Sequence, residues 1–260
     1  MKPKAIILMA TGTNRDLDVS QALELAGAQV EIIPLSRLRN GDRHLSDYQL
    51  LVLPGGFSYA DALGAGKLLA IDLKVYFADA MHEFIQQGKP VIGICNGFQA
   101  LVKAGMLPAL SSTAGSPQAT LTFNSHGHFE CRWVTLKPSS NLCVWTQGLV
   151  EDIYCPVAHG EGNFLPANQA ILDQMRVNDQ IALVYSQSDG NPAAGRYPDN
   201  PNGSVWDIAG ICNPQGNVLG LMPHPENHIF TYQHPHRTRG AKNGAGLALF
   251  INGVRFAASF

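Results

Sequence analysis

Short apolar runs alternate with helix-patterned segments through the first third of the chain, and this alternation constrains the fold more than any other feature. The apolar runs have the length and composition of strands, and they lie at 4–9, 29–35, 48–56 and 89–94. Helices are predicted between them at 19–28 and at about 66–87. Strands joined by helices form right-handed βαβ units in a buried parallel sheet, and the ligands of such sheets bind beyond the carboxyl ends of the strands.

The second half of the chain has a different pattern, with strand-like runs and few helices between them. These runs are "TLTFN", "FECRWVTL", "IYCPVAHGEG", "QIALVYSQ", "WDIAGICN" and "NVLGLMPHPE". Pro, Asn and Gly gather at 190–204, which predicts a long structured loop, and a last helix is predicted at about 244–257. The sequence shows no repeat and no clear boundary, so we expect one α/β domain over 1–260 with an antiparallel extension from its middle.

Composition favours a globular protein that binds neither nucleic acid nor a membrane. The 260 residues are 45% hydrophobic, and their formal net charge of −2 lacks the basic excess of a nucleic-acid binder. No run reaches the roughly 20 apolar residues of a membrane span, and the apolar stretch at 5–10 is too short for a signal peptide. Five cysteines at irregular spacing, with no C-x-x-C pair, indicate reduced thiols and a cytoplasmic protein.

Nine histidines are more than usual, and H-x-H pairs at 126/128 and 234/236 raise the question of a metal site. A structural or catalytic metal needs further ligands at a recognisable spacing, and no cysteine or carboxylate stands beside these pairs in that way. We therefore expect no metal, and the histidines are interpreted as solvated loop residues.

The segment "GICNG" places a cysteine between two glycines at the tip of an apolar strand, directly before a helix. This is G-x-C-x-G, the cysteine counterpart of the G-x-S-x-G nucleophile elbow. A turn this sharp needs small neighbours, and the N-terminus of the following helix favours a thiolate at Cys95. The alternative, a small buried hydrophobic residue, is the commoner fate of a lone cysteine, so the elbow requires a base and an oxyanion hole in support.

Both requirements have candidates at the ends of other strands. "MPHPEN" places His224 and Glu226 after an apolar run, and in an extended chain residues two apart face the same side. Glu226 then orients the imidazole as a base for the thiol. "LPGG" supplies a Gly-Gly turn, so the N–H groups of Gly56 and of Asn96, the residue after Cys95, are predicted to stabilise an oxyanion. The alternatives are a loop histidine, a solvated carboxylate and a plain tight turn.

These pieces, in the order P-G-G, G-x-C-x-G-x-Q and H-P-E, resemble the class I glutamine amidotransferases. The resemblance implies their three-layer fold, with a mostly parallel central sheet, helices on both faces and a Cys95–His224–Glu226 triad. Longer stretches are similar to the glutaminase subunits of phosphoribosylformylglycinamidine synthase, an enzyme of purine biosynthesis. They are "TGTNRDLDVSQALELAGAQV", "LPGGFSYADALGAG", "CNGFQ", "AHGEGNF", "YPDNPNGS" and "MPHPEN".

That resemblance implies that Cys95 attacks the side-chain amide of L-glutamine, that a glutamyl thioester forms, and that ammonia passes to a synthetase subunit. The synthetase subunit, with or without a small accessory subunit, would use ATP and magnesium to convert formylglycinamide ribonucleotide into formylglycinamidine ribonucleotide. No cofactor is expected in this chain. The resemblance further implies that Phe57 and Gln99 help to frame the glutamine pocket, while "AHGEGNF" (158–164) lies near it with no assigned role.

Several positions depart from the pattern of this family. Asn227 stands where arginine is usual, and His126 and His128 stand where serine and arginine are expected. The segment 231–243 also matches less well, and its basic residues are interpreted as solvated. Two other functions stay open: a glutaminase that serves another synthetase, and a binding subunit that keeps the fold without the activity.

Overall fold

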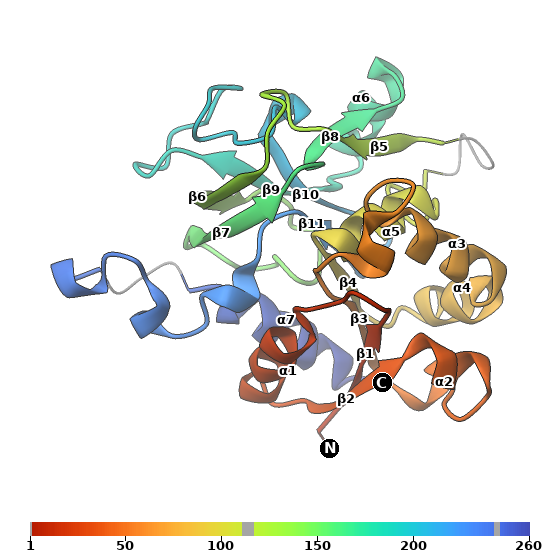
Figure 1. The fold of residues 1–260 in the computed structure, drawn as a ribbon. Helices are drawn as coiled ribbons and strands as arrows, with labels where there is room; N and C mark the ends of the chain where they lie inside the picture. Colours follow the sequence, from red (N-terminus) through yellow and green to blue (C-terminus); the bar gives the residue numbers. More distant parts are fainter. Residues whose placement is uncertain (1, 111–116, 242–244) are drawn as a thin grey trace.

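Nine strands form one sheet, parallel in one half and antiparallel in the other (Figure 1). The computed structural model describes residues 2–110, 117–241 and 245–260. In sheet order the strands are β2 (Gln29–Pro34), β1 (Lys4–Met9), β3 (Leu50–Leu53), β4 (Val91–Ile94), β11 (Val218–Leu221), β10 (Ile208–Cys212), β9 (Ile181–Ser186), β6 (Glu130–Pro138) and β7 (Ile153–His159). A separate two-stranded sheet pairs β5 (Ala119–Thr122) with β8 (Asn163–Pro166).

The parallel half runs from β2 to β11, and every neighbouring pair within it is parallel. From β11 outward, β10, β9, β6 and β7 pair antiparallel. β3 and β4 are buried along their whole length, which is why they read as continuous apolar runs and not as alternating ones. The predicted parallel sheet with an antiparallel extension is confirmed.

Helices cover both faces of the parallel half and complete three layers (Figure 1). On one face α1 (Asp16–Leu25) packs against α7 (Leu247–Ala257), and on the other α5 (Asn96–Lys103) packs against α3 (Lys67–Val75), which also contacts α4 (Ala78–Gln86). The remaining helices are α2 (Leu35–Arg39), beside the edge strand β2, and α6 (Gln169–Val177). No helix among the described residues is long and apolar enough to span a bilayer.

The helix predicted over 66–87 is wrong in its continuity, because α3 and α4 are separate. Val75, Tyr76 and Phe77 are β-branched or aromatic residues of low helix propensity, and the chain turns at this point. The break lets Phe77 enter the core while Tyr76 stays half-exposed, with the Arg39 guanidinium 3.8 Å from its ring centre. Among the α-helices and strands of the described residues, three were not predicted: α2, β8, and α6, whose N-terminus is capped by the Asn168 side chain.

Other boundaries also shift. The strand expected over 48–56 ends at Leu53, and Pro54, Gly55 and Gly56 belong to the loop that follows. The last helix begins at 247, and part of the stretch expected to start it, 242–244, lies outside the described residues. The long loop predicted at 190–204 is confirmed, and buried Asn200 and Asn202 hold it by side-chain hydrogen bonds.

Candidate active site

Cys95 lies at the tip of β4 in a backbone conformation that non-glycine residues rarely adopt, with φ 50° and ψ −104°. Its N–H donates to Leu221 O on β11 across 2.7 Å, so the strain is held by the sheet. The glycines on either side are required by packing. A Cβ on Gly97 would collide with the Leu53 carbonyl oxygen, and one on Gly93 would lie 2.5 Å from Leu101 Cδ1. The predicted elbow geometry is confirmed.

His224 and Glu226 follow β11, and their buried side chains meet with His224 Nδ1 2.7 Å from Glu226 Oε1. The contact was predicted from an extended chain, and that reason is wrong. Pro225–Asn227 is a 3-10 turn. The turn, together with the His224 N–H donating to Pro156 O across 2.8 Å, brings the carboxylate back onto the ring.

The charges around His224 favour its protonated form. Burial by itself lowers the pKa of this imidazole, but the Glu226 carboxylate and the contact with Cys95 outweigh burial and raise the pKa to about 10. Glu226 Oε2 is buried without a hydrogen-bond partner among the described residues, so His224 is the partner that compensates the carboxylate charge. An imidazolium beside a thiol is the arrangement of an activated cysteine nucleophile.

The loop after β3 packs directly against this imidazole. A Cβ on Gly55 would lie 2.8 Å from His224 Cε1, and one on Gly56, where φ is 135°, would lie 2.7 Å from Asn14 N. Glycine is therefore needed at both positions. Neither the Gly56 N–H nor the Asn96 N–H donates a hydrogen bond to another described residue, so both can serve an oxyanion.

The Asn96 side chain locks that loop to the nucleophile. Its Oδ1 accepts the Ser58 N–H at 3.1 Å and the Ser58 hydroxyl at 2.5 Å, and its Nδ2 donates to Asp61 Oδ1 at 2.8 Å. Tyr59, Ala60 and Asp61 all have positive φ, which is a costly conformation for these residues. Asn96 thus holds a strained loop in place over the elbow.

A cavity of about 160 Å³ opens beside Cys95. Three other residues predicted for the site line it, Gly56, Phe57 and Gln99, whereas Asn96, His224 and Glu226 do not. The Gln99 amide is already engaged, because its Nε2 donates to Glu161 O at 2.7 Å and its Oε1 accepts from Asn96 at 3.2 Å. Gln99 therefore shapes the wall of the cavity through Glu161.

Residues 2–257 match the family model of the CobB/CobQ-like glutamine amidotransferase domain. The chain belongs to this glutamine amidotransferase family. The amidotransferase is 56% identical over 241 residues to phosphoribosylformylglycinamidine synthase subunit PurQ of Treponema denticola, covering 88% of this chain and 89% of that one. It is 40% identical to the same subunit of Dehalococcoides mccartyi over 98% of both chains. Its structure resembles a chain of the solved PurLQS of Thermotoga maritima, with a TM-score of 0.75, 31% identity and coverage of 98% and 99%.

The amidotransferase cavity is also lined by residues for which the sequence predicted no role. They are Asp61, Ala65, Phe123, Phe129, Ala158, His159, Gly160 and Glu161. Four of these belong to "AHGEGNF", so this motif lies in the wall of the cavity beside Cys95. Glu161 is fixed by the Ala65 N–H at 3.2 Å and by Lys103 Nζ at 3.5 Å, so this wall is tied to α5. No local pattern marks Phe123 or Phe129 as pocket residues.

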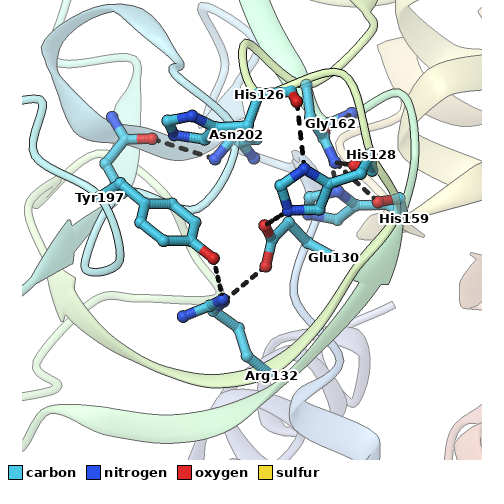
Figure 2. A network of polar contacts seen from close by, with 10 residues as sticks. His126, His128, Glu130, Arg132, His159, Gly162, Tyr197 and Asn202 are labelled. Atoms are coloured by element: carbon cyan, nitrogen blue, oxygen red, sulfur yellow. Dashed lines mark hydrogen bonds and ion pairs between the residues drawn. The ribbon is translucent and has the colours of Figure 1, made fainter.

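The departures from the family pattern lie outside this cavity. Asn227 Nδ2 donates to Asp18 Oδ2 on α1 at 2.9 Å. His126 and His128 are exposed, and His128 Nε2 lies 2.7 Å from Glu130 Oε1 within a surface network that includes Arg132 and Tyr197 (Figure 2).

The interpretation of the histidine pairs as solvated is wrong for His234, which is buried against Trp133 and Tyr154. Arg237 and Arg239 are exposed, as expected, and Lys242 lies outside the described residues. The described residues include no group of three or more His, Cys, Asp or Glu side chains placed to hold a metal ion.

Proposed function

We propose that this chain is the glutaminase subunit of phosphoribosylformylglycinamidine synthase, and that it forms a single amidotransferase domain over 1–260. The observation that carries the proposal is the contact chain from Cys95 through His224 to Glu226 beside an open cavity. Its relatives named PurQ, which align over nearly the whole chain, support the particular enzyme.

In the first half of the reaction the Cys95 sulfur attacks the carboxamide carbon of glutamine. The electron pair of the carbonyl moves onto oxygen, where the N–H groups of Gly56 and Asn96 stabilise the negative charge. His224 then gives its proton to the departing nitrogen, so ammonia leaves and a glutamyl thioester remains on Cys95. Glu226 contributes by holding Nδ1–H, which leaves the other ring nitrogen for this proton transfer.

In the second half, neutral His224 takes a proton from water as the water oxygen attacks the thioester carbon. The same oxyanion site stabilises the second tetrahedral intermediate, the carbon–sulfur bond breaks, and glutamate leaves with Cys95 and His224 restored. In this proposal the cycle uses two backbone N–H groups and the side chains of Cys95, His224 and Glu226. ATP and magnesium belong to the synthetase partner in this proposal.

The rim of the cavity fits a partner that covers it. Phe57, Phe123 and Phe129 line the cavity and are 46%, 71% and 50% exposed. Three exposed aromatic side chains around one opening are typical of a protein-binding surface. Since ammonia would leave through this opening, we propose that the synthetase subunit docks here, and that the complex works in the cytoplasm.

A glutaminase assay with and without the synthetase subunit and formylglycinamide ribonucleotide tests the proposal. We expect glutamate release that rises when both are present, together with formation of formylglycinamidine ribonucleotide. Stimulation by a different synthetase alone would assign the chain to another pathway. If an electrophilic glutamine analogue leaves Cys95 unlabelled in the assembled complex, as judged by intact mass, the chain is a binding subunit.

A further inference from the structure

His159 ends β7 and lines the same cavity as Cys95, yet the proposed reaction gives it no task. The side chain is 3% exposed, and its Nε2 is a buried polar atom with no hydrogen-bond partner among the described residues. Gly162 lets the ring lie flat against the chain, because a Cβ there would collide with the imidazole. Figure 2 shows His159 and Gly162 side by side behind His128. An unpaired polar atom in this position is costly unless a ligand uses it.

The hydrogen bonds of Asn124 decide which nitrogen of His159 carries the proton. Asn124 Nδ2 donates to two backbone carbonyls, His128 O at 2.9 Å and His159 O at 2.8 Å. Asn124 Oδ1 accepts the Gly162 N–H at 3.0 Å, so the amide orientation is fixed by backbone groups alone. His159 Nδ1 lies 3.2 Å from that oxygen and must be the donor. Nε2 is then an unprotonated acceptor.

His159 is also held in its neutral form. Burial lowers the pKa of this imidazole, the positive charge of nearby His224 lowers it further, and it falls to about 4. At neutral pH the ring therefore offers a lone pair at Nε2 and cannot offer a second N–H. Cys95 Sγ lies 3.8 Å from the carbonyl oxygen of Ala158, the residue before His159, so the end of β7 lies beside the nucleophile.

We propose that His159 Nε2 accepts a hydrogen bond from the carboxamide N–H of bound glutamine, and so distinguishes glutamine from glutamate. This inference rests on the proposed glutaminase function. A carboxamide has two N–H donors, whereas the γ-carboxylate of the product has only acceptors. Glutamate would therefore leave the buried lone pair of Nε2 unpaired and facing negative oxygen. Sites that pair with a substrate N–H discriminate strongly against analogues that lack it.

The test compares two substrates in the complex, glutamine and the γ-methyl ester of glutamate, which keeps the α-amino group but has no N–H on its leaving group. For His159→Phe we expect kcat/KM for glutamine to fall about tenfold, and kcat/KM for the ester to fall by less than about threefold. His159→Gln, which restores an acceptor oxygen, should recover part of the preference for glutamine. His126→Ala, at an exposed histidine outside the cavity, is the matched control.

An equal loss with both substrates, or no loss with either, would overturn the inference. If wild-type protein releases no glutamate, the proposed function itself has failed. A second measurement uses nitrogen-15 histidine spectra of Cys95→Ala, so it needs neither activity nor the Phe variant. We expect His159 to be protonated at Nδ1 alone, and its Nε2 signal to move with glutamine and not with glutamate at the same concentration. A proton on Nε2 in the free protein, or equal shifts with both ligands, would contradict the assignment.

Discussion

His224 Nδ1 and Glu226 Oε1 lie 2.7 Å apart in the interior, in a turn that follows the strand beside the nucleophile. Because an ionised carboxylate can only accept hydrogen bonds, this contact places a proton on Nδ1 of His224. The other ring nitrogen is then directed away from Glu226. It also links the charge of Glu226 to the protonation of the histidine that touches Cys95.

Glu226→Gln should shift the alkaline side of the pH profile. The imidazolium of His224 supplies the proton for the leaving nitrogen, so activity persists below its pKa of about 10 and is lost as the pH rises through it. Without the negative charge of Glu226 that pKa falls, and we expect the alkaline limb of kcat/KM to move down by about one pH unit or more. Stopped assays from pH 6 to about 10.5, with the synthetase subunit at saturating concentration, would measure the position of the alkaline limb. An unchanged limb would mean that Glu226 does not set the charge of His224.

Cys95→Ala should abolish glutamine-dependent synthesis and leave ammonia-dependent synthesis intact. The substitution removes the atom that forms the thioester, so we expect a loss of at least about 10³-fold with glutamine. With ammonium salt as the nitrogen source, the synthetase subunit does not need the thiol. Both rates are measured on the same assembled complex. Loss of both would show that Cys95 maintains the structure of the complex.

Gly97→Ala should destabilise the protein, because the added Cβ would collide with the Leu53 carbonyl oxygen between α5 and β3. Overpacking against backbone cannot be relieved by a rotamer change, and we expect unfolding free energy to fall by about 3 kcal/mol in urea titrations. Gly160→Ala is the control, since its nearest contact would be Phe129 Cδ2 at 3.8 Å. A similar decrease in unfolding free energy in both variants would contradict the steric explanation and indicate a general cost of replacing glycine.

Phe123→Ser should weaken binding of the synthetase subunit. Phe123 is exposed at the rim of the cavity and contributes little to the core, so the fold should be unchanged while Kd rises about tenfold. Val177→Ser is the control, because Val177 is 83% exposed and does not line the cavity. Calorimetric titration of the two variants compares them directly. Equal affinities would exclude this rim as the docking surface.

The fold and the nucleophile could be predicted from the sequence because both depend on local patterns. Buried parallel strands appear in the sequence as continuous apolar runs. The glycines on either side of Cys95 are needed because a sharp turn is made within five residues. The reliance on local patterns also explains why the helix predicted over 66–87 is wrong. The helical pattern of the sequence continues through Val75–Phe77, but the helix is interrupted there because Phe77 enters the core.

The sequence by itself determined the βα order, the elbow at Cys95 and the residue types able to serve as its base and orienter. Only the tertiary structure decided which distant residues meet. It showed that the Gly55 loop packs against His224, that Asn96 holds Ser58 and Asp61, and that Asn124 leaves His159 Nε2 as an acceptor. Backbone preferences are set by near neighbours. Contacts between residues tens of positions apart depend on how strands pair and helices pack, and no local pattern encodes that arrangement.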